Sequence, residues 1–350
     1  MEVPSIFLNR ILLEAAKKKA SSLHLSIGSI PVLRINGKLV QMDKESILTL
    51  DILEKIINSV IDSEQLAKLK KNKKIVVVDN FAGSFRFRVN IFYQKGLPSL
   101  SFNYIPDVIR NPKDFRIYNQ ISKLINLNSG LLVIAGPNDS GKTATTAALV
   151  EEINQGKKKY IITLEDPIEY IFVNKKSVIE QMQIGRDTLS YVSGLKHCLD
   201  EDVDLVYIGE IKDELSSAMN YILELATGNC FVILEINASN SINVVESILR
   251  AIYKKDYEEA ARYRLADTLT GIISQTLLIG RGNELFLASE VLIVNPAVKS
   301  LIREGKIYQL ESIIQTSKAE GMVSMKKSIE ELVQEGKVNG EDIKKYRNIY

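Results

Sequence analysis

A run of eight residues near the middle of the chain matches the pattern G-x-x-x-x-G-K-[ST] of phosphate-binding loops. The run consists of Gly136, Pro137, Asn138, Asp139, Ser140, Gly141, Lys142 and Thr143. An apolar stretch at 131–135 precedes it and a helical pattern at 143–154 follows it, which is the context that the motif requires. Backbone N–H groups of such a loop converge on phosphate oxygens, and the helix adds its positive N-terminal end. The alternative is a glycine-containing turn that matches by chance, and the flanking elements disfavour it.

Individual residues of this loop predict how it would hold a nucleotide. Lys142 places an ammonium between the β- and γ-phosphates of ATP, and the Thr143 hydroxyl is suited to ligate Mg²⁺. Asp139 brings a carboxylate near the phosphates, which costs Coulomb energy unless it points to solvent or to a cation. Because Asp tolerates a left-handed backbone, the loop conformation itself can survive. We therefore expect ATP binding with weakened affinity.

Phosphoryl transfer also needs carboxylates that hold the metal and orient the attacking water. Glu165 follows the strand-like run 160–164, and Glu210 follows the run 205–208 and one glycine. Ligands bind at the carboxyl ends of strands in open parallel sheets, so both residues should lie beside the loop. Either one alone could be a surface acid at a strand end. Together they are candidate catalytic residues, and the sequence leaves open which of them is the general base.

The elements that would position these residues indicate an α/β fold. Apolar runs at 131–135, 160–164, 205–208 and 230–234 alternate with helical segments, which predicts a mainly parallel sheet with helices on both faces. We place this domain at 118–350, with a C-terminal helical region from about 296. A segment with two prolines, 106–117, is the predicted linker to an N-terminal α+β domain at 1–105.

The N-terminal domain mixes helical and strand patterns. Helices are predicted at 6–19 and 52–60, and an Asn36-Gly37 pair predicts a hairpin turn. The run 85–91 alternates strictly between apolar and polar residues. Arg86 and Arg88 should therefore share one face of a strand, and the run 100–104 is expected to pair with it.

The composition of the chain limits which partners and which location in the cell we expect. The chain has 350 residues, a formal net charge of +2 and two cysteines. A charge so close to zero gives no general argument for nucleic acid as a partner. The cysteine number suggests neither a disulfide framework nor a zinc site, so a cytoplasmic location is expected. Since no apolar run has the length of a membrane span, we expect no direct membrane insertion.

Several motifs together resemble the secretion ATPase superfamily of the GspE/PilT type, and most of all its pilus-retraction ATPases. The phosphate loop is similar to the Walker A motif of that family. Further similarities are a strand at 20–26, an arginine-bearing strand at 85–90, an acidic box at 162–170, a Walker B segment at 209–213 and C-terminal signatures at 272–278, 295–304 and 321–322. The resemblance runs almost from end to end.

The resemblance implies a PAS-like N-terminal domain and a RecA-like ATPase domain in a ring of six. It implies ATP and Mg²⁺ as ligands, with Thr143 and Glu210 at the metal and Arg86 and Arg88 closing over the phosphates. The implied ring is homo-hexameric, or mixed with a paralogous ATPase. It would act on pilin subunits through a platform protein of the inner membrane and lie at the cytoplasmic face of that membrane through this partner.

The chain departs from the family at a histidine box that follows the Walker B strand. Its segment 227–237 contains no histidine. Ile236 cannot donate a hydrogen bond, Asn237 could substitute in part, and Glu235 would bring a negative charge toward a phosphate if it pointed inward. Lys212 stands where the family has an arginine and keeps the charge without the bidentate fork.

Three functions remain as hypotheses. The leading one is an ATP-hydrolysing hexameric motor of the pilus-retraction type, with reduced turnover. The second is a slow or non-hydrolysing paralogue that acts as a structural or regulatory subunit of such a ring. A nucleic-acid motor of the wider RecA-like group is the third, and the near-neutral charge and the acidic box disfavour it.

Overall fold

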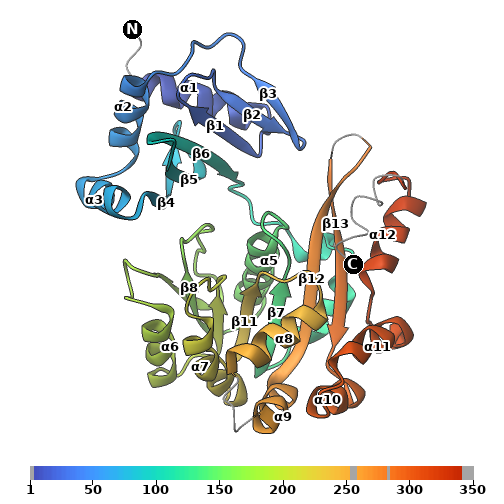
Figure 1. Ribbon diagram of the computed structural model, residues 1–350. Coiled ribbons are helices and arrows are strands. Elements are labelled where there is room, and N and C mark those ends of the chain that lie inside the picture. Colours follow the sequence, from blue (N-terminus) through green and yellow to red (C-terminus); the bar gives the residue numbers. More distant parts are fainter. Residues whose placement is uncertain (1–3, 253–257, 282–283, 341–350) are drawn as a thin grey trace. The chain divides into compact units, whose positions relative to one another are not determined.

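The computed structural model describes residues 4–252, 258–281 and 284–340 (Figure 1). The chain forms two compact units, Met1–Val108 and Ile109–Tyr350. The division lies inside the segment 106–117, which the sequence suggested as a linker. Ile117, at the end of that segment, is buried in the same apolar cluster as Ile121 of helix α4 (Tyr118–Leu124).

The first unit contains a six-stranded sheet in the order β3-β2-β1-β6-β5-β4, and every neighbouring pair of strands is antiparallel. Its apolar core combines helical residues such as Ile11 and Leu53 with strand residues such as Leu23 and Phe102. The elements are α1 (Pro4–Lys17), β1 (Ser22–Ser26), β2 (Val32–Ile35), β3 (Lys38–Gln41), α2 (Leu50–Val60), α3 (Ser63–Asn72), β4 (Lys74–Phe81), β5 (Phe85–Gln94) and β6 (Leu97–Ile105).

Two local predictions for this unit are confirmed. Asn36 and Gly37 have φ of 51° and 78° and form the two-residue turn between β2 and β3. Positive φ at both positions is what the favoured hairpin turn demands, and Asn and Gly adopt it most readily. Strand β5 also pairs with β6 as expected, in an antiparallel register.

The second unit contains a seven-stranded sheet in the order β13-β12-β7-β11-β10-β8-β9. All neighbouring pairs are parallel except β13 and β12, which are antiparallel. The strands are β7 (Gly130–Ala135), β8 (Tyr160–Glu165), β9 (Val178–Gln183), β10 (Leu205–Ile208), β11 (Phe231–Ile236), β12 (Leu269–Ile279) and β13 (Leu285–Ile293). The expected parallel strands are all present, whereas β9, β12 and β13 were not predicted.

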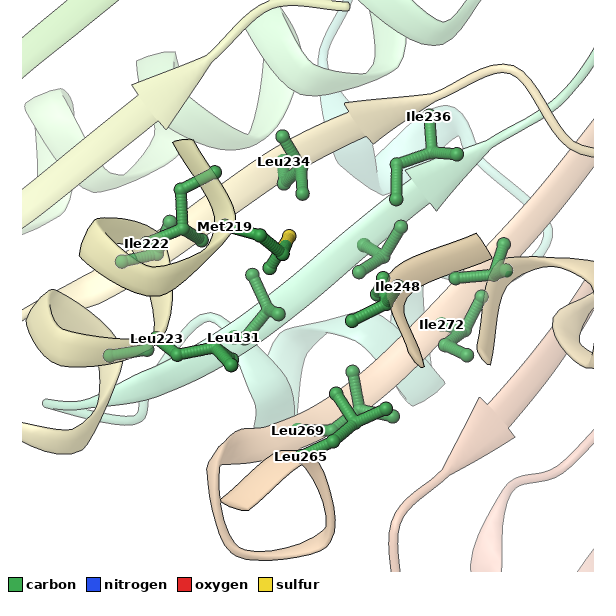
Figure 2. Packing of buried hydrophobic residues seen from close by; sticks show 14 of the residues in the cluster. Leu131, Met219, Ile222, Leu223, Leu234, Ile236, Ile248, Leu265, Leu269 and Ile272 are labelled. Atoms are coloured by element: carbon green, nitrogen blue, oxygen red, sulfur yellow. The ribbon is translucent and has the colours of Figure 1, made fainter. Parts of the chain in front are cut away.

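Helices cover both faces of this sheet, as the alternating pattern predicted. On one face, Leu149 and Ile153 of α5 (Lys142–Gly156) share an apolar cluster with Leu132 of β7. On the other face, Met219 of α7 and Ile248 of α8 pack near Leu131 (Figure 2). The helices of this second face are α6 (Tyr191–Asp200), α7 (Leu215–Thr227), α8 (Ser241–Ile252) and α9 (Glu258–Thr268). Successive residues of β7 thus serve opposite faces, which is the alternation of a buried central strand.

The chain continues from β13 into the expected C-terminal helices. They are α10 (Pro296–Arg303), α11 (Leu310–Thr316) and α12 (Met325–Gln334), with short 3₁₀ turns at η2 (Ile307–Gln309) and η3 (Lys318–Glu320); an earlier one, η1 (Pro112–Asp114), precedes α4. Helix α12 packs on the end of the sheet, where Met325 and Leu332 contact a cluster with Leu278 and Ala288. The last part of the predicted helical region, 341–350, lies outside the described residues. Among the residues that are described, none of the helices combines the length and apolar character needed to cross a bilayer.

Candidate nucleotide-binding site

The phosphate loop lies between β7 and α5, where the motif predicted it. Gly141 stands at the N-cap of α5 with φ 85°, and Asp139 has φ 61°, so two loop positions use the left-handed region. Gly136 has no room for a side chain, because a Cβ there would lie 2.3 Å from the Ser140 hydroxyl oxygen and 2.4 Å from the Gln275 carbonyl oxygen. The glycines are thus required by the backbone path itself.

Lys142 links this loop to the neighbouring acidic residue. Its ammonium nitrogen lies 2.9 Å from the carbonyl oxygen of Gly136 and 3.1 Å from that of Pro137. The same nitrogen lies 3.1 Å from Oε2 of Glu210, which follows the end of β10. The Lys142 side chain is only 6% exposed, so the pair is held where few waters can screen it. The structure thus brings together Lys142 and Glu210, as the strand-end argument expected.

Glu165 is the last residue of β8, and only 3% of it is exposed. Thr163 donates a hydrogen bond to its Oε1 at 2.7 Å, and Gln181 donates a second to the same oxygen at 3.2 Å. Burial nevertheless raises the pKa of the Glu165 carboxyl to about 8. Burial therefore favours the protonated form of Glu165, whereas Glu210 pairs with a cation.

Glu235 is a third carboxyl group at the site, and it does point inward. It lies on β11, which separates β7 from β10 in the sheet, and 3% of it is exposed. Thr143 donates a hydrogen bond from Oγ1 to Oε2 of Glu235 at 3.3 Å, and the Tyr207 hydroxyl donates to Oε1 at 2.9 Å. Burial raises the pKa of Glu235 to about 7, although the Tyr207 hydrogen bond and the nearby charge of Lys142 both lower it.

The alternation of β11 explains why Glu235 rather than Ile236 reaches the loop. Ile233 belongs to the apolar cluster on the α5 face, whereas Leu234 and Ile236 belong to the cluster on the opposite face. Glu235 shares the parity of Ile233 and therefore projects toward the start of α5. Asn237 also contacts the loop, since its amide nitrogen donates to the side-chain oxygen of Asn138 at 3.1 Å.

Gln275 on β12 is a site residue to which the sequence had given no role. Its amide nitrogen donates to the backbone carbonyl of Ser140 at 2.9 Å, and the residue is fully buried. The only available signal was a polar Ser-Gln-Thr run inside an otherwise apolar segment at 269–279. Such a run indicates that buried polar side chains make hydrogen bonds there, but it does not show which groups are their partners.

Two further observations fit the loop to a phosphate group. The Ser140 hydroxyl oxygen is buried and lacks a hydrogen-bond partner within the described part of the chain. No described side chain caps α5 at Gly141, so the N–H groups of its first turn stay available to a ligand. Buried polar groups are seldom left without a partner in proteins, and a bound anion would satisfy these.

Arg86 and Arg88 belong to the other unit. They alternate along β5 with buried Phe87 and Val89, as predicted, and lie on its opposite face. The guanidinium of Arg86 reaches the side-chain oxygen of Asn80 on the paired strand at 3.5 Å. Their expected contact with nucleotide stays a prediction.

Comparison with known proteins places these features in a family. The family described as "Type II/IV secretion system protein" matches residues 114–281. A "Twitching motility protein" of Neisseria gonorrhoeae is 31% identical over 307 residues, which cover 87% of this chain and 81% of that protein. The "Type IV pilus retractation ATPase PilT" of Pseudomonas aeruginosa is 29% identical and matches 98% of both chains.

Solved structures agree with the sequence comparison. The crystal structure of the pilus retraction motor PilT with bound ADP superposes with a TM-score of 0.81 and 32% identity, over 95% of each chain. The Legionella pneumophila ATPase DotB has a TM-score of 0.83 at 19% identity, which shows the shared fold. The chain therefore belongs to the type II/IV secretion system protein family of GspE/PilT-type ATPases.

Proposed function

We propose that this chain is an ATPase motor of the pilus-retraction and secretion type, which hydrolyses ATP to ADP and phosphate. The observation that carries the proposal is the contact between Lys142 of the phosphate loop and Glu210, with 3.1 Å between nitrogen and oxygen. Glu210 follows β10, which is the second strand from β7 in the sheet. A phosphate-binding cation and an ionised acid thus meet at the carboxyl edge of a parallel sheet, where ligands of such folds bind. The ADP bound to the similar PilT structure supports the same ligand class.

The substrate would compete with the protein for Lys142. The lysine now bonds two loop carbonyls and Glu210, and phosphate oxygens are stronger partners for it. Transfer of the ammonium to the phosphates would release the Glu210 carboxylate from Lys142, so that one of its oxygens could bind Mg²⁺ and the other could accept a proton from water. Glu165 is the other candidate for that base, because burial brings the pKa of its carboxyl close to neutral pH.

Mg²⁺ would be held by the Thr143 hydroxyl and by Glu210, together with phosphate oxygens, and would supply positive charge to the phosphates. Thr143 is the second residue of α5 and lies directly after the lysine. The residues present fit this role, because a hydroxyl and a carboxylate are oxygen ligands of the kind that Mg²⁺ prefers.

The family relationship supports further parts of the proposal. They are a PAS-like first unit, a RecA-like second unit, a ring of six subunits and a phosphate contact by Arg86 or Arg88. A pilus platform protein of the inner membrane would be the partner, and the ring would lie at the cytoplasmic side of that membrane. The name of the Neisseria relative supports twitching motility as the process served, and the name of the Pseudomonas relative supports pilus retraction.

A second candidate is a slow or non-hydrolysing subunit of such a ring. Ile236 and Asn237 occupy the segment where the family carries its histidine box, and Asp139 adds a charge to the loop. The changes at 236 and 237 would affect how the bound nucleotide is sensed and coupled to domain movement. They leave Lys142 and Glu210 in place. Removal of one transition-state donor from a comparable site costs about 10²–10³ in rate.

Steady-state phosphate release by the purified chain with ATP and Mg²⁺ distinguishes the two candidates. The motor predicts turnover that Lys142→Ala abolishes. Lys159→Ala is the matched control, because Lys159 forms a similar ion pair with Asp204 at 2.7 Å outside the loop. Binding of ATP without turnover above the Lys142→Ala background would contradict the motor and favour the non-hydrolysing subunit.

A further inference from the structure

Glu235 uses both of its carboxylate oxygens at the phosphate loop. One accepts the hydrogen bond from Thr143, and the other accepts the hydrogen bond from Tyr207. Tyr207 is itself 2% exposed and lies on β10, directly beside β11. The carboxyl group is therefore held from two sides, as buried polar groups in proteins usually are.

The direction of the Thr143 hydrogen bond has a chemical consequence. A threonine hydroxyl has one proton to donate and two lone pairs that can accept or ligate. When the proton goes to Glu235, the lone pairs stay free for a cation. Glu235 therefore assists a metal at Thr143 and does not compete with it, and a bound cation would favour the ionised form of the Glu235 carboxyl.

We propose that Glu235 is a positioning residue for the Mg²⁺ that accompanies the nucleotide, holding the Thr143 hydroxyl in its metal-binding orientation and adding negative charge behind it. The inference rests on the proposed function, since it takes Thr143 as a metal ligand. Groups that hydrogen-bond the ligands of a metal typically change metal affinity by about 10- to 100-fold. Glu235 lies in the segment where the family carries its histidine box. This chain would thus use a residue of its altered box to support the metal ligand Thr143.

The test measures how much Mg²⁺ the full chain needs to bind a fluorescent nucleotide. Binding of mant-ADP is followed at fixed nucleotide while Mg²⁺ is titrated, and the affinity is also measured in EDTA. For Glu235→Leu we expect the half-saturating Mg²⁺ concentration to rise by about 10-fold or more, with the affinity in EDTA near that of the wild type. Glu235→Gln should show a smaller rise, because its amide oxygen still accepts from Thr143 but carries no charge.

Two further variants separate a metal role from a structural one. Glu290→Gln is the matched control, since Glu290 is also a buried carboxyl group and accepts a hydrogen bond from the Ser241 hydroxyl at 2.7 Å. It should keep the Mg²⁺ requirement of the wild type. Tyr207→Phe frees one oxygen of Glu235 and should raise the requirement in the same direction as Glu235→Gln. If the Glu235 variants fail to fold, Tyr207→Phe decides the question.

An unchanged Mg²⁺ requirement in Glu235→Leu, or in Tyr207→Phe where that variant decides, would overturn the inference. An equal loss of affinity with Mg²⁺ and in EDTA would also overturn it, because that pattern belongs to a purely structural residue. Failure of the proposed function would look different: the wild type itself would bind no mant-ADP or release no phosphate.

Discussion

Gln275 and Ser140 connect the phosphate loop to the strand beside it. The side-chain amide of Gln275 donates to the Ser140 carbonyl, with 2.9 Å between nitrogen and oxygen, and Gln275 has no exposed surface. Strand β12 pairs directly with β7, from which the loop departs. The loop is thus held in shape before a ligand arrives, which reduces the ordering cost of binding.

Replacement of Gln275 by Leu should weaken mant-ADP binding by about 3- to 10-fold, because a neutral hydrogen bond contributes about 0.5–1.5 kcal/mol. Titration of the purified variant measures the change. Gln155→Leu is the control, since Gln155 is an exposed glutamine of α5 that bonds Glu151. Equal affinities for Gln275→Leu and the wild type would mean that the loop keeps its shape without this contact.

Gly136→Ala should abolish nucleotide binding and lower the melting temperature, because the new Cβ would meet atoms at 2.3 Å and 2.4 Å. One of these atoms is a backbone oxygen of Gln275, which cannot turn aside. Gly156→Ala, at the other end of α5, is the comparison, since no atom lies within 4 Å of its added Cβ. That variant should be as stable as the wild type or more so, because Ala suits a helix better than Gly. Normal binding by Gly136→Ala would contradict the described loop conformation.

Glu165 should make stability depend on pH. Burial raises the pKa of its carboxyl to about 8 in the folded protein, whereas an ordinary glutamate ionises near about 4.3. Between these values the folded chain binds more protons at this residue than the unfolded chain does. Its contribution to the free energy of unfolding is therefore largest below about pH 4.3, falls as the pH rises, and levels off above about pH 8.

Melting temperatures at several pH values between 5 and 8 provide the measurement. Relative to the wild type, Glu165→Gln should gain stability steadily as the pH rises, because its amide cannot ionise. Glu180→Gln, a change at an exposed residue of β9, should follow the wild-type profile. A constant difference between Glu165→Gln and the wild type across this range would show that Glu165 ionises normally in the folded protein.

Asp139→Asn should bind mant-ADP more tightly than the wild type at low salt. Asp139 is exposed in the loop with φ 61°, and Asn removes the charge while it tolerates the same backbone. The gain should shrink as salt is added, because screening weakens exposed charges. Asp202→Asn removes an exposed charge before β10 and should leave the affinity as it is. No gain at low salt would mean that the Asp139 carboxylate does not act on the phosphates.

The sequence predicted best those features that depend only on residues close together in the chain. The loop, the strands that lead to Glu165 and Glu210, and the alternation of Arg86 with Phe87 all follow from local spacing. Strand β9 has little apolar character, and β12 contains a polar run, so neither stood out as a strand. The contacts of Gln275 and Glu235 could not be predicted, since they depend on strand order, which joins residues far apart in the chain.

The central claim is hydrolysis at the site that Lys142 and Glu210 share. Its most direct test compares ATP binding and phosphate release in the wild type and in Glu210→Gln. We predict that both proteins bind ATP and that phosphate release in the variant is about 100-fold slower or more, since a general base contributes about 10²–10⁴ in rate. Equal phosphate release by the two proteins, or none by a wild type that binds ATP, would contradict the account.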